Sequence, residues 1–454
     1  GVTSAAFLTY FFRDLGIEVG HRFPERMKEG YGLNEDAIRA IRDQGASLLI
    51  TADCGITAAR EVELACSLGL DVIVTDHHQV GDDGLPPAIA VLNPHRPDCA
   101  YPYRFLSGVG LAFKLAVAVR NTLHRRAGWD KARLPNMRRY LDLVALGTIA
   151  DVAPLTGENH VLTRHGLDVL TTTDKPGLVA LKSVADVDNK VSARAIGFAL
   201  GPRLNAAGRL GKADCGFHLL TSFDLKEAKE LAQILDQTNR ERKKIQEQVQ
   251  EEAEYLIGRE VSLDEDLIIV LASENFHSGV IGIVASRLVE KYFRPVVLVA
   301  LEGGAGKGSA RSIPKFHLHR AFTECAGHLV RFGGHAYAAG LTIEEGKVDS
   351  FRDGLNEIGN RILRKEDLIP ELLIDTPLEI SEIDRELYSQ VSLMEPFGAE
   401  NPSPVFLIRG VHISGLRLIG SEKNHVRFQA VQNKARIDAV GFNLAQEFSS
   451  VDSG

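Results

Sequence analysis

Cysteine is scarce in this sequence, and the few cysteines are widely separated. The chain has 5 cysteines in 454 residues, and no two of them form a Cys-x-x-Cys pair. The lack of close pairs argues against a zinc ribbon, and the odd number at scattered positions argues against a disulfide scaffold. Free cysteines are typical of a reducing compartment, so we expect a cytoplasmic protein. The residues are Cys54, Cys66, Cys99, Cys215 and Cys325.

Long apolar runs and an excess of positive charge are also absent. No run of 18 or more apolar residues occurs, so we expect no membrane-spanning helix, and no signal peptide is visible. The formal net charge is −8, which excludes a globally basic surface that would attract nucleic acid. A nucleic-acid function would therefore need a local cleft in which Arg and Lys are concentrated.

The sequence does contain enough apolar material for several folded domains. Hydrophobic residues make up 44% of the chain and charged residues 25%, which is ordinary for a protein with real cores. At ~150 residues per domain, this length predicts about three domains.

Two short apolar runs, residues 48–52 and 72–75, are rich in β-branched residues and predict strands buried on both faces of a parallel sheet. Residues 58–69 between them have apolar side chains at helical spacing and end at Gly69, which completes a βαβ unit. Ligands of such sheets gather beyond the carboxyl ends of the strands. Acidic and imidazole side chains occupy those ends, namely Asp53, Asp76, His77 and His78.

These side chains indicate a divalent-metal site. Carboxylate oxygens with imidazole nitrogens are the ligands that Mn²⁺ or Mg²⁺ would use. A third apolar run, residues 89–92, ends in Asn93-Pro94-His95, and a helix-like segment over 138–150 ends at Asp151. Asp151 fits the same cluster, but an isolated Asp after a helix or strand is also a common cap or turn residue.

Two glycine-rich segments suggest phosphate binding. Residues 201–209 (GPRLNAAGR) read as a small-residue loop with two arginines, which suits phosphate because small residues let the backbone approach. Residues 303–312 (GGAGKGSARS) do not have the spacing of an ATP-binding loop, because Lys307 is followed by Gly308. Hydroxyls and a guanidinium in such a glycine-rich turn can still bind a phosphate.

The order of the remaining segments predicts the domain plan. Asp224 caps a long, charge-dense helix that ends near Gly258, and such a polar helix usually bridges two domains. A second α/β region begins with a strand at 267–271. Beyond Ile369, four short alternating segments (405–408, 412–418, 426–431 and 435–442) resemble the start of an oligonucleotide-binding β-barrel, which needs five strands to close.

In this order, the motifs resemble the DHH phosphoesterase superfamily, specifically the RecJ-type single-stranded-DNA exonucleases, over nearly the whole chain. The fold implied is α/β: a parallel-sheet DHH domain (1–221), a connecting helix (222–260), a second α/β domain called DHHA1 (261–366) and a partial OB-type barrel (367–454). The matching segments are 52–55 (ADCG), 76–78 (DHH), 146–151 (LGTIAD), 201–209, 277 with 279–285 (GVIGIVA), and 331–340.

The resemblance also implies roles for individual residues. Asp53, His77 and Asp151 are expected to bind two divalent cations, Mn²⁺ or Mg²⁺, about 4 Å apart. His78 and Asp76 are expected to act in catalysis at the scissile phosphate. The expected DNA and phosphate contacts are Arg26, Arg203, Asn205, Arg209, Ser309, Arg311, Ser312, Gly334 and His335.

One departure from the family pattern concerns the first motif. The family carries Asp-x-Asp-Gly just before Val-Thr, whereas this chain opens at Gly1-Val2-Thr3. We therefore expect a fragment without the two aspartates, and impaired as a catalyst. The C-terminal barrel also stops short of closure.

The implied activity is 5′-to-3′ hydrolysis of single-stranded DNA to mononucleotides in repair and recombination. The implied partners are single-stranded DNA, a helicase and a single-strand-binding protein. We expect a monomer that does not associate with a membrane. Two alternatives remain: a non-catalytic scaffold of the same family that binds single-stranded DNA, and a DHH oligoribonucleotide phosphodiesterase.

Overall fold

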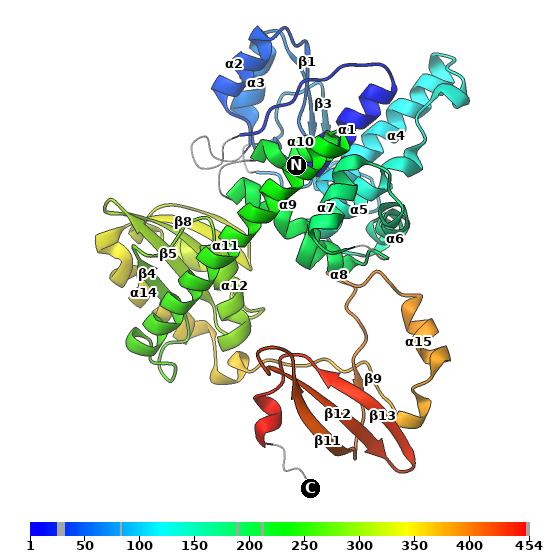
Figure 1. Cartoon of the computed structure of the whole chain (residues 1–454). Coiled ribbons are helices and arrows are strands. Elements are labelled where there is room, and N and C mark those ends of the chain that lie inside the picture. Colours follow the sequence, from blue (N-terminus) through cyan, green and yellow to red (C-terminus); the bar gives the residue numbers. More distant parts are fainter. Residues whose placement is uncertain (25–31, 82–83, 188–189, 210–212, 451–454) are drawn as a thin grey trace. The chain divides into compact units, whose positions relative to one another are not determined.

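A computed structural model of the chain describes residues 1–24, 32–81, 84–187, 190–209 and 213–450. The chain divides into two compact units, residues 1–370 and 371–454 (Figure 1). Among the described residues, none of the helices combines the length and apolar character that crossing a bilayer requires.

The first domain contains a small parallel sheet. Its strands are β1 (Leu48–Ile50), β2 (Asp71–Thr75) and β3 (Ala90–Leu92), in the order β1-β2-β3. All three run parallel, with Leu49 opposite Val72 and Val74 opposite Val91. Parallel strands bring their carboxyl ends to one edge, so the segments that follow β1, β2 and β3 lie together there.

The prediction that both strands are buried on both faces is correct only for β2. Val72 and Val74 are fully buried on one face of β2, and Thr75 is fully buried on the other, where Ile73 is partly buried. Leu48 is 47% exposed because β1 is an edge strand among the described residues. The regular ladder of β1 also stops at Ile50, earlier than the apolar run in the sequence.

Helices make up most of the first domain. They are α1 (Val2–Asp14), α2 (Glu35–Asp43), α3 (Ala59–Ser67), α4 (Gly108–Arg126), α5 (Leu141–Ala150), α6 (Gly157–Thr171), α7 (Pro176–Val184), α8 (Ala193–Ala195), α9 (Gly201–Arg209) and α10 (Ala213–Thr221). Short turns η1 (Lys131–Arg133) and η2 (Met137–Tyr140) lie between α4 and α5, and a π-helical turn, η3 (Ile196–Leu200), precedes α9.

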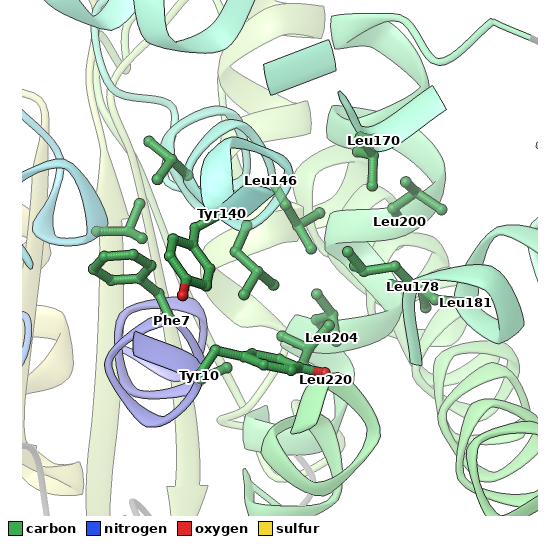
Figure 2. Close-up of a cluster of buried hydrophobic side chains, with 14 of the residues drawn as sticks. Phe7, Tyr10, Tyr140, Leu146, Leu170, Leu178, Leu181, Leu200, Leu204 and Leu220 are labelled. Carbon is green, nitrogen blue, oxygen red and sulfur yellow. The ribbon is translucent and has the colours of Figure 1, made fainter. Parts of the chain in front are cut away.

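Helix α5 lies at the centre of this domain. Every residue from Leu141 to Ile149 is buried, and the sequence is accordingly apolar except for Asp142 and Thr148. Figure 2 shows Leu146 of α5 with Phe7 of α1 and Tyr140 among the buried side chains. This packing fixes the position of Asp151, the residue directly after α5.

The segment 201–209 is a helix, α9, and the prediction of a loop is wrong. It follows the π-helical turn η3 directly, and Leu204, Ala206 and Ala207 are buried. The small residues therefore serve close helix packing at this point.

Helix α11 (Leu225–Glu260) joins the two cores of the first unit. Asp224 caps it by accepting hydrogen bonds from the backbone N–H groups of Lys226 and Glu227, as predicted. Its first half contributes Ala228, Ala232 and Leu235 to the first core, and its second half contributes Val249 and Leu256 to the next. The helix continues through Gly258.

The second domain is built on a five-stranded mixed sheet in the order β4-β5-β6-β8-β7. Residues alternate along β4 and β5, so one face packs on α11 and α12 and the other on α13 and α14. Its elements are β4 (Ile269–Ser273), α12 (Ile281–Tyr292), β5 (Val296–Glu302), β6 (Ala305–Arg311), α13 (Leu318–Glu324), η4 (Ala326–His328), β7 (Leu329–Gly334), β8 (Ala338–Glu344), η5 (Glu345–Lys347), α14 (Val348–Ile362) and η6 (Lys365–Leu368).

The glycine-rich segment 303–312 is mainly a strand. Only Gly303 and Gly304, both with positive φ, form the turn, and Ala305–Arg311 is β6. Glycines within β6 leave room for neighbouring side chains: a Cβ on Gly306 would lie 2.4 Å from a Val299 methyl.

The second unit contains an antiparallel sheet, β11 (His412–Ile419), β12 (His425–Gln432) and β13 (Ala435–Gly441), with a separate parallel pair, β9 (Thr376–Pro377) and β10 (Phe406–Leu407). Helix α15 (Arg385–Ser392) and the turns η7 (Ile380–Glu382) and η8 (Glu447–Ser450) complete it. The described strands form open sheets and no closed barrel, in agreement with a partial OB-type fold.

We predict that the buried ion pair between Asp142 and Lys175 is important for the stability of the first domain. Their side chains lie 2.7 Å apart and are 0% and 7% exposed. Asp142→Ala leaves a buried, uncompensated ammonium group, which should lower the free energy of unfolding by about 3–5 kcal/mol. The measurement is urea-induced unfolding, monitored by the fluorescence emission of Trp129. This residue is the only tryptophan of the chain and lies in this domain.

The matched control is Arg39→Ala, which breaks the exposed Arg39–Glu35 pair. It should change stability by no more than about 0.5 kcal/mol. Equal effects of the two substitutions would show that the buried pair has no special role.

Candidate metal centre and phosphate site

The backbone after β1 turns sharply and directs Asp53 into the domain. Asp53 has a positive φ of 68°, a conformation that costs free energy for a residue other than glycine. Its N–H still bonds to the carbonyl of Thr75 at 2.9 Å, and the Thr51 hydroxyl donates to the carbonyl of Cys54 at 2.7 Å. Pairing with β2 therefore holds Asp53 in this strained geometry.

Helix α4 begins directly against the Asp53 side chain. A Cβ on Gly108, the first residue of α4, would lie only 2.4 Å from Asp53 Oδ1. Ser107 caps the helix and its hydroxyl is 2.7 Å from that of Thr148 on α5. The absent side chain at Gly108 is thus what allows the helix and the carboxylate to occupy adjacent space.

Three elements bring their side chains together at this edge of the sheet. His77 Nε2 lies 2.8 Å from Asp53 Oδ1 and 3.5 Å from Asp151 Oδ2. Asp53, His77 and His78 each offer a ligand atom, and these atoms all lie within 4.8 Å of one another. The amino group of Gly1 lies 2.5 Å from Asp53 Oδ2. The sequence-predicted cluster is therefore a real spatial cluster.

The donor set fits a divalent cation. His77 Nε2 is buried and has no hydrogen-bond partner of good geometry among the described residues, although two carboxylates are close to it. Oxygen and imidazole ligands that converge in this way suit Mn²⁺ or Mg²⁺. Residues Asp53, His77 and Asp151, with His78 beside them, could hold such an ion.

The charges in the cluster shift the pKa values of its carboxyl groups in opposite directions. Burial alone would raise the pKa of Asp53, but its close contact with His77 lowers it well below the usual range. Burial raises the pKa of Asp151. Asp151 follows α5 directly, and the next residue, Val152, has a positive φ of 56°.

Asp76 has a positioning role in the structure. It is almost fully buried, and its carboxylate accepts hydrogen bonds from the Ile56 N–H at 3.0 Å and the His78 N–H at 3.2 Å. Its Oδ1 also lies 2.6 Å from His78 Nδ1. Hydrogen bonding to Asp76 raises the pKa of His78 despite its partial burial. Asp76 thus orients His78 and favours its charged form.

A second polar cluster lies in the five-stranded sheet. Arg311 Nη1 donates to the Ser309 hydroxyl at 3.2 Å and to the carbonyl of Ala310 at 2.7 Å. A Cβ on Gly282, near the start of α12, would lie 2.9 Å from the Ser309 hydroxyl and 3.1 Å from Arg311. Burial lowers the pKa of Arg311. A guanidinium and a hydroxyl beside a helix N-terminus are suitable groups for a phosphate.

The adjacent strands bring further predicted residues to the same end of this sheet. Arg311 lies opposite Ala338 on β8, and Gly334 on β7 lies opposite Ala339. Gly334 has a φ of 138°, and a Cβ there would meet the Ala338 carbonyl at 2.5 Å. His335, which follows it, is exposed. The Ser312 hydroxyl donates to the carbonyl of Phe316 at 2.7 Å.

Other predicted phosphate contacts lie elsewhere. Arg203 on α9 forms an ion pair with Asp236 of α11 at 2.8 Å and donates to the carbonyls of Ala199 and Val184. These contacts fasten α9 to its neighbours, and Asn205 is exposed on the same helix. Arg26 and the side chain of Arg209 lie outside the described residues.

Known families match all three parts of the chain. The model described as "DHH family, N-terminal domain" matches residues 1–148, "DHHA1 domain" matches 265–360, and "RecJ OB domain" matches 374–454. The single-stranded-DNA-specific exonuclease RecJ of Escherichia coli K12 is 39% identical over 460 residues, which cover 98% of this chain and 79% of that protein. The chain belongs to the RecJ family.

Two further RecJ proteins extend this comparison. The RecJ of Bacillus subtilis strain 168 is 41% identical over 449 residues, and the match covers 98% of this chain. This chain spans only 55% of the length of that relative. A crystal structure of RecJ from Thermus thermophilus in complex with Mn²⁺ superposes with a TM-score of 0.81 at 32% identity, over 97% of this chain and 61% of that one.

Sequence reasoning assigned no role to three residues near the cluster: Asn93, His95 and Gly108. Asn93, after β3, donates from Nδ2 to the His78 carbonyl at 2.9 Å and accepts from the His95 N–H at 2.7 Å. Burial and the nearby charges of His77 and Arg104 lower the pKa of His95. The sequence could have pointed to Asn93 and His95, because they follow a third predicted strand at the edge where the other site residues lie. Gly108 gave no such signal.

We predict that Gly108→Ala weakens metal binding without unfolding the domain. The new methyl group overlaps Asp53 and must displace its carboxylate, so Mn²⁺ affinity should fall about 10–100-fold. The measurement is Mn²⁺ titration followed by electron paramagnetic resonance, with circular dichroism as the check on folding.

Gly197→Ala is the matched control, because a Cβ at Gly197 meets nothing within 4 Å. It should leave Mn²⁺ affinity unchanged. Equal affinity in the two variants would mean that Asp53 is not a ligand.

Proposed function

We propose that this chain is the catalytic part of a metal-dependent nuclease that hydrolyses single-stranded DNA from its 5′ end to mononucleotides. The observation that carries the proposal is the convergence of Asp53, His77 and His78, with ligand atoms within 4.8 Å, at the carboxyl edge of a parallel sheet. The names of the RecJ relatives supply the substrate class and the reaction.

Each residue of the cluster has a separate proposed role. Asp53, His77 and Asp151 would hold two divalent cations, Mn²⁺ or Mg²⁺. The crystal structure of the Thermus relative is a complex with Mn²⁺. Such cations supply the charge that activates a water and stabilises the leaving 3′ oxygen. His78 is held by Asp76 through Nδ1 at 2.6 Å. It would contact the scissile phosphate, because this contact with Asp76 fixes the orientation of its ring.

The phosphate site of the second domain would bind the strand. Arg311, with Ser309 and the N-terminal end of α12, would bind the 5′ phosphate, and Gly334 with His335 would let the backbone of the strand approach. The OB-type unit would bind incoming single strand by stacking and backbone charge. Local cations would thus serve DNA binding although the chain as a whole is acidic.

The experiments below also distinguish the two alternative functions that the sequence leaves open. A non-catalytic scaffold would bind single-stranded DNA without cleaving it, and an oligoribonucleotide phosphodiesterase would prefer short RNA. The helicase and single-strand-binding partners, the monomeric state and the cytoplasmic location stay predictions.

We predict that cleavage depends on carboxylates placed next to Gly1 and on Asp53. The Gly1 amino group lies 2.5 Å from Asp53, so residues joined before Gly1 enter the cluster. A version with Asp-x-Asp joined to Gly1 should release mononucleotides from 5′-labelled single-stranded DNA with Mn²⁺. Asp53→Asn in that version should lower the rate at least about 1,000-fold, because a side chain that would hold the cations loses its charge.

The control is Asp353→Asn, an exposed carboxylate on α14. It should cleave at the parent rate. DNA binding without cleavage by the extended version, with Mn²⁺ bound, would favour the scaffold, and preferential cleavage of short RNA would favour the phosphodiesterase.

We predict that Arg311→Gln removes the preference for a 5′ phosphate. The guanidinium is the charged group of the second site, and its loss should weaken binding of 5′-phosphorylated strands about tenfold and leave 5′-hydroxyl strands nearly unaffected. Binding is measured by fluorescence anisotropy with EDTA present. Arg320→Gln, at an exposed position of α13, is the control. An unchanged preference would exclude Arg311 from the 5′ site.

A further inference from the structure

The segment between α4 and α5 is strongly basic in an acidic chain. Residues 120–139, here called the basic arm, contain seven Lys and Arg residues and a single acidic residue, Asp130. The formal net charge of the whole chain is −8. The arm begins in the last turns of α4 and passes through η1 and η2 before α5 (Figure 1).

Most of this charge is exposed and has no acidic partner. Five exposed cations of the arm form no ion pair with any described residue: Arg125, Arg126, Lys131, Arg133 and Arg138. The single acidic side chain, Asp130, accepts a hydrogen bond from the Ala132 N–H and caps η1. A cluster of exposed cations with a single acidic side chain is a local positive surface, and such a surface is suited to an external polyanion.

The arm also presents an aromatic ring on a fixed turn. Trp129 is 38% exposed. Its N–H donates to the Leu123 carbonyl at 3.2 Å, and its own carbonyl lies 2.9 Å from His124 Nδ1. Leu134 and Pro135 beyond it are buried, and Arg120 donates to the Pro135 carbonyl at 2.9 Å. These hydrogen bonds hold the backbone of the turn that carries the indole.

The arm is remote from the metal cluster. Gly108 at the start of α4 contacts Asp53, whereas the arm lies at the other end of this helix. Helix α4 has 19 residues, which corresponds to a length of about 28 Å. At about 3.4 Å per stacked nucleotide, a strand needs about eight nucleotides to span that distance.

We propose that the basic arm is an additional binding site for single-stranded DNA, separate from the metal cluster and from the Arg311 site. Its unpaired cations bind phosphates, and the indole of Trp129 stacks on a base. An exposed aromatic ring among cations favours a single strand, because a duplex hides the faces of its bases. The choice of DNA as the polyanion rests on the proposed function.

The test uses the fluorescence of Trp129, which is the only tryptophan of the chain and reports on the arm alone. The full chain in EDTA is titrated with the oligonucleotide dT20, and binding is followed in parallel by anisotropy of fluorescein-labelled dT20. We expect saturable quenching of the tryptophan emission. Binding of dT20 without quenching would overturn the proposal.

Charge removal tests the role of the cations. The variant Arg125→Gln/Arg126→Gln/Lys131→Gln/Arg133→Gln should weaken the quenching transition at least tenfold and reduce its salt slope by about three, because four phosphate contacts are lost. The control Arg39→Gln/Arg60→Gln/Lys347→Gln/Lys365→Gln removes the same charge from exposed positions elsewhere. It should leave the transition within about twofold; equal losses in the two variants would overturn the proposal.

Two competitors identify the partner. Equal quenching by a 20-residue poly-glutamate peptide would assign the arm to acidic proteins, and equal quenching by a 20-base-pair duplex would exclude stacking on a single strand; either result overturns the proposal. The assay needs no metal and no cleavage. Failure of Mn²⁺-dependent hydrolysis with intact quenching would therefore contradict the proposed function and leave this inference standing.

Discussion

The close approach of helix α4 to Asp53 is the constraint on which the metal centre depends. Asp53 is held in a strained backbone conformation by pairing with β2, and its carboxylate occupies the space that a side chain at Gly108 would fill. The strain is tolerated because the surrounding packing allows few alternatives. The same packing brings α5 beside α4 through Ser107 and Thr148, and so positions Asp151.

Electrostatics in this protein are local. Burial is unfavourable for the charged forms of Asp53 and Asp151. The contact with His77 outweighs burial at Asp53, whereas burial outweighs the charge of His77 at Asp151. A cation at the cluster would favour the ionised form of both carboxyl groups. Although the net charge of the whole chain is −8, the basic arm carries seven Lys and Arg residues and a single acidic residue. Net charge therefore does not predict where a polyanion can bind.

The differences between sequence and structure have physical causes. The sequence of residues 201–209 favours a loop, because Gly201, Pro202 and Gly208 have low helix propensity. The segment is nevertheless helical because it packs on α11, where Arg203 pairs with Asp236. Tertiary contacts override local propensity at this point. Likewise, residues 305–311 form a strand because β5 and β8 pair with them on both sides.

The sequence by itself determined the parallel βαβ unit and the acidic and imidazole residues at its strand ends, because hydrophobic periodicity is a local property. It also identified Asp224 as a helix cap, since the capping side chain bonds to its own helix. Only the tertiary structure decided that Gly108 makes room for Asp53, that Asp76 orients His78, and that Arg203 serves packing. These relations join residues on different elements, and their distances depend on how the elements pack.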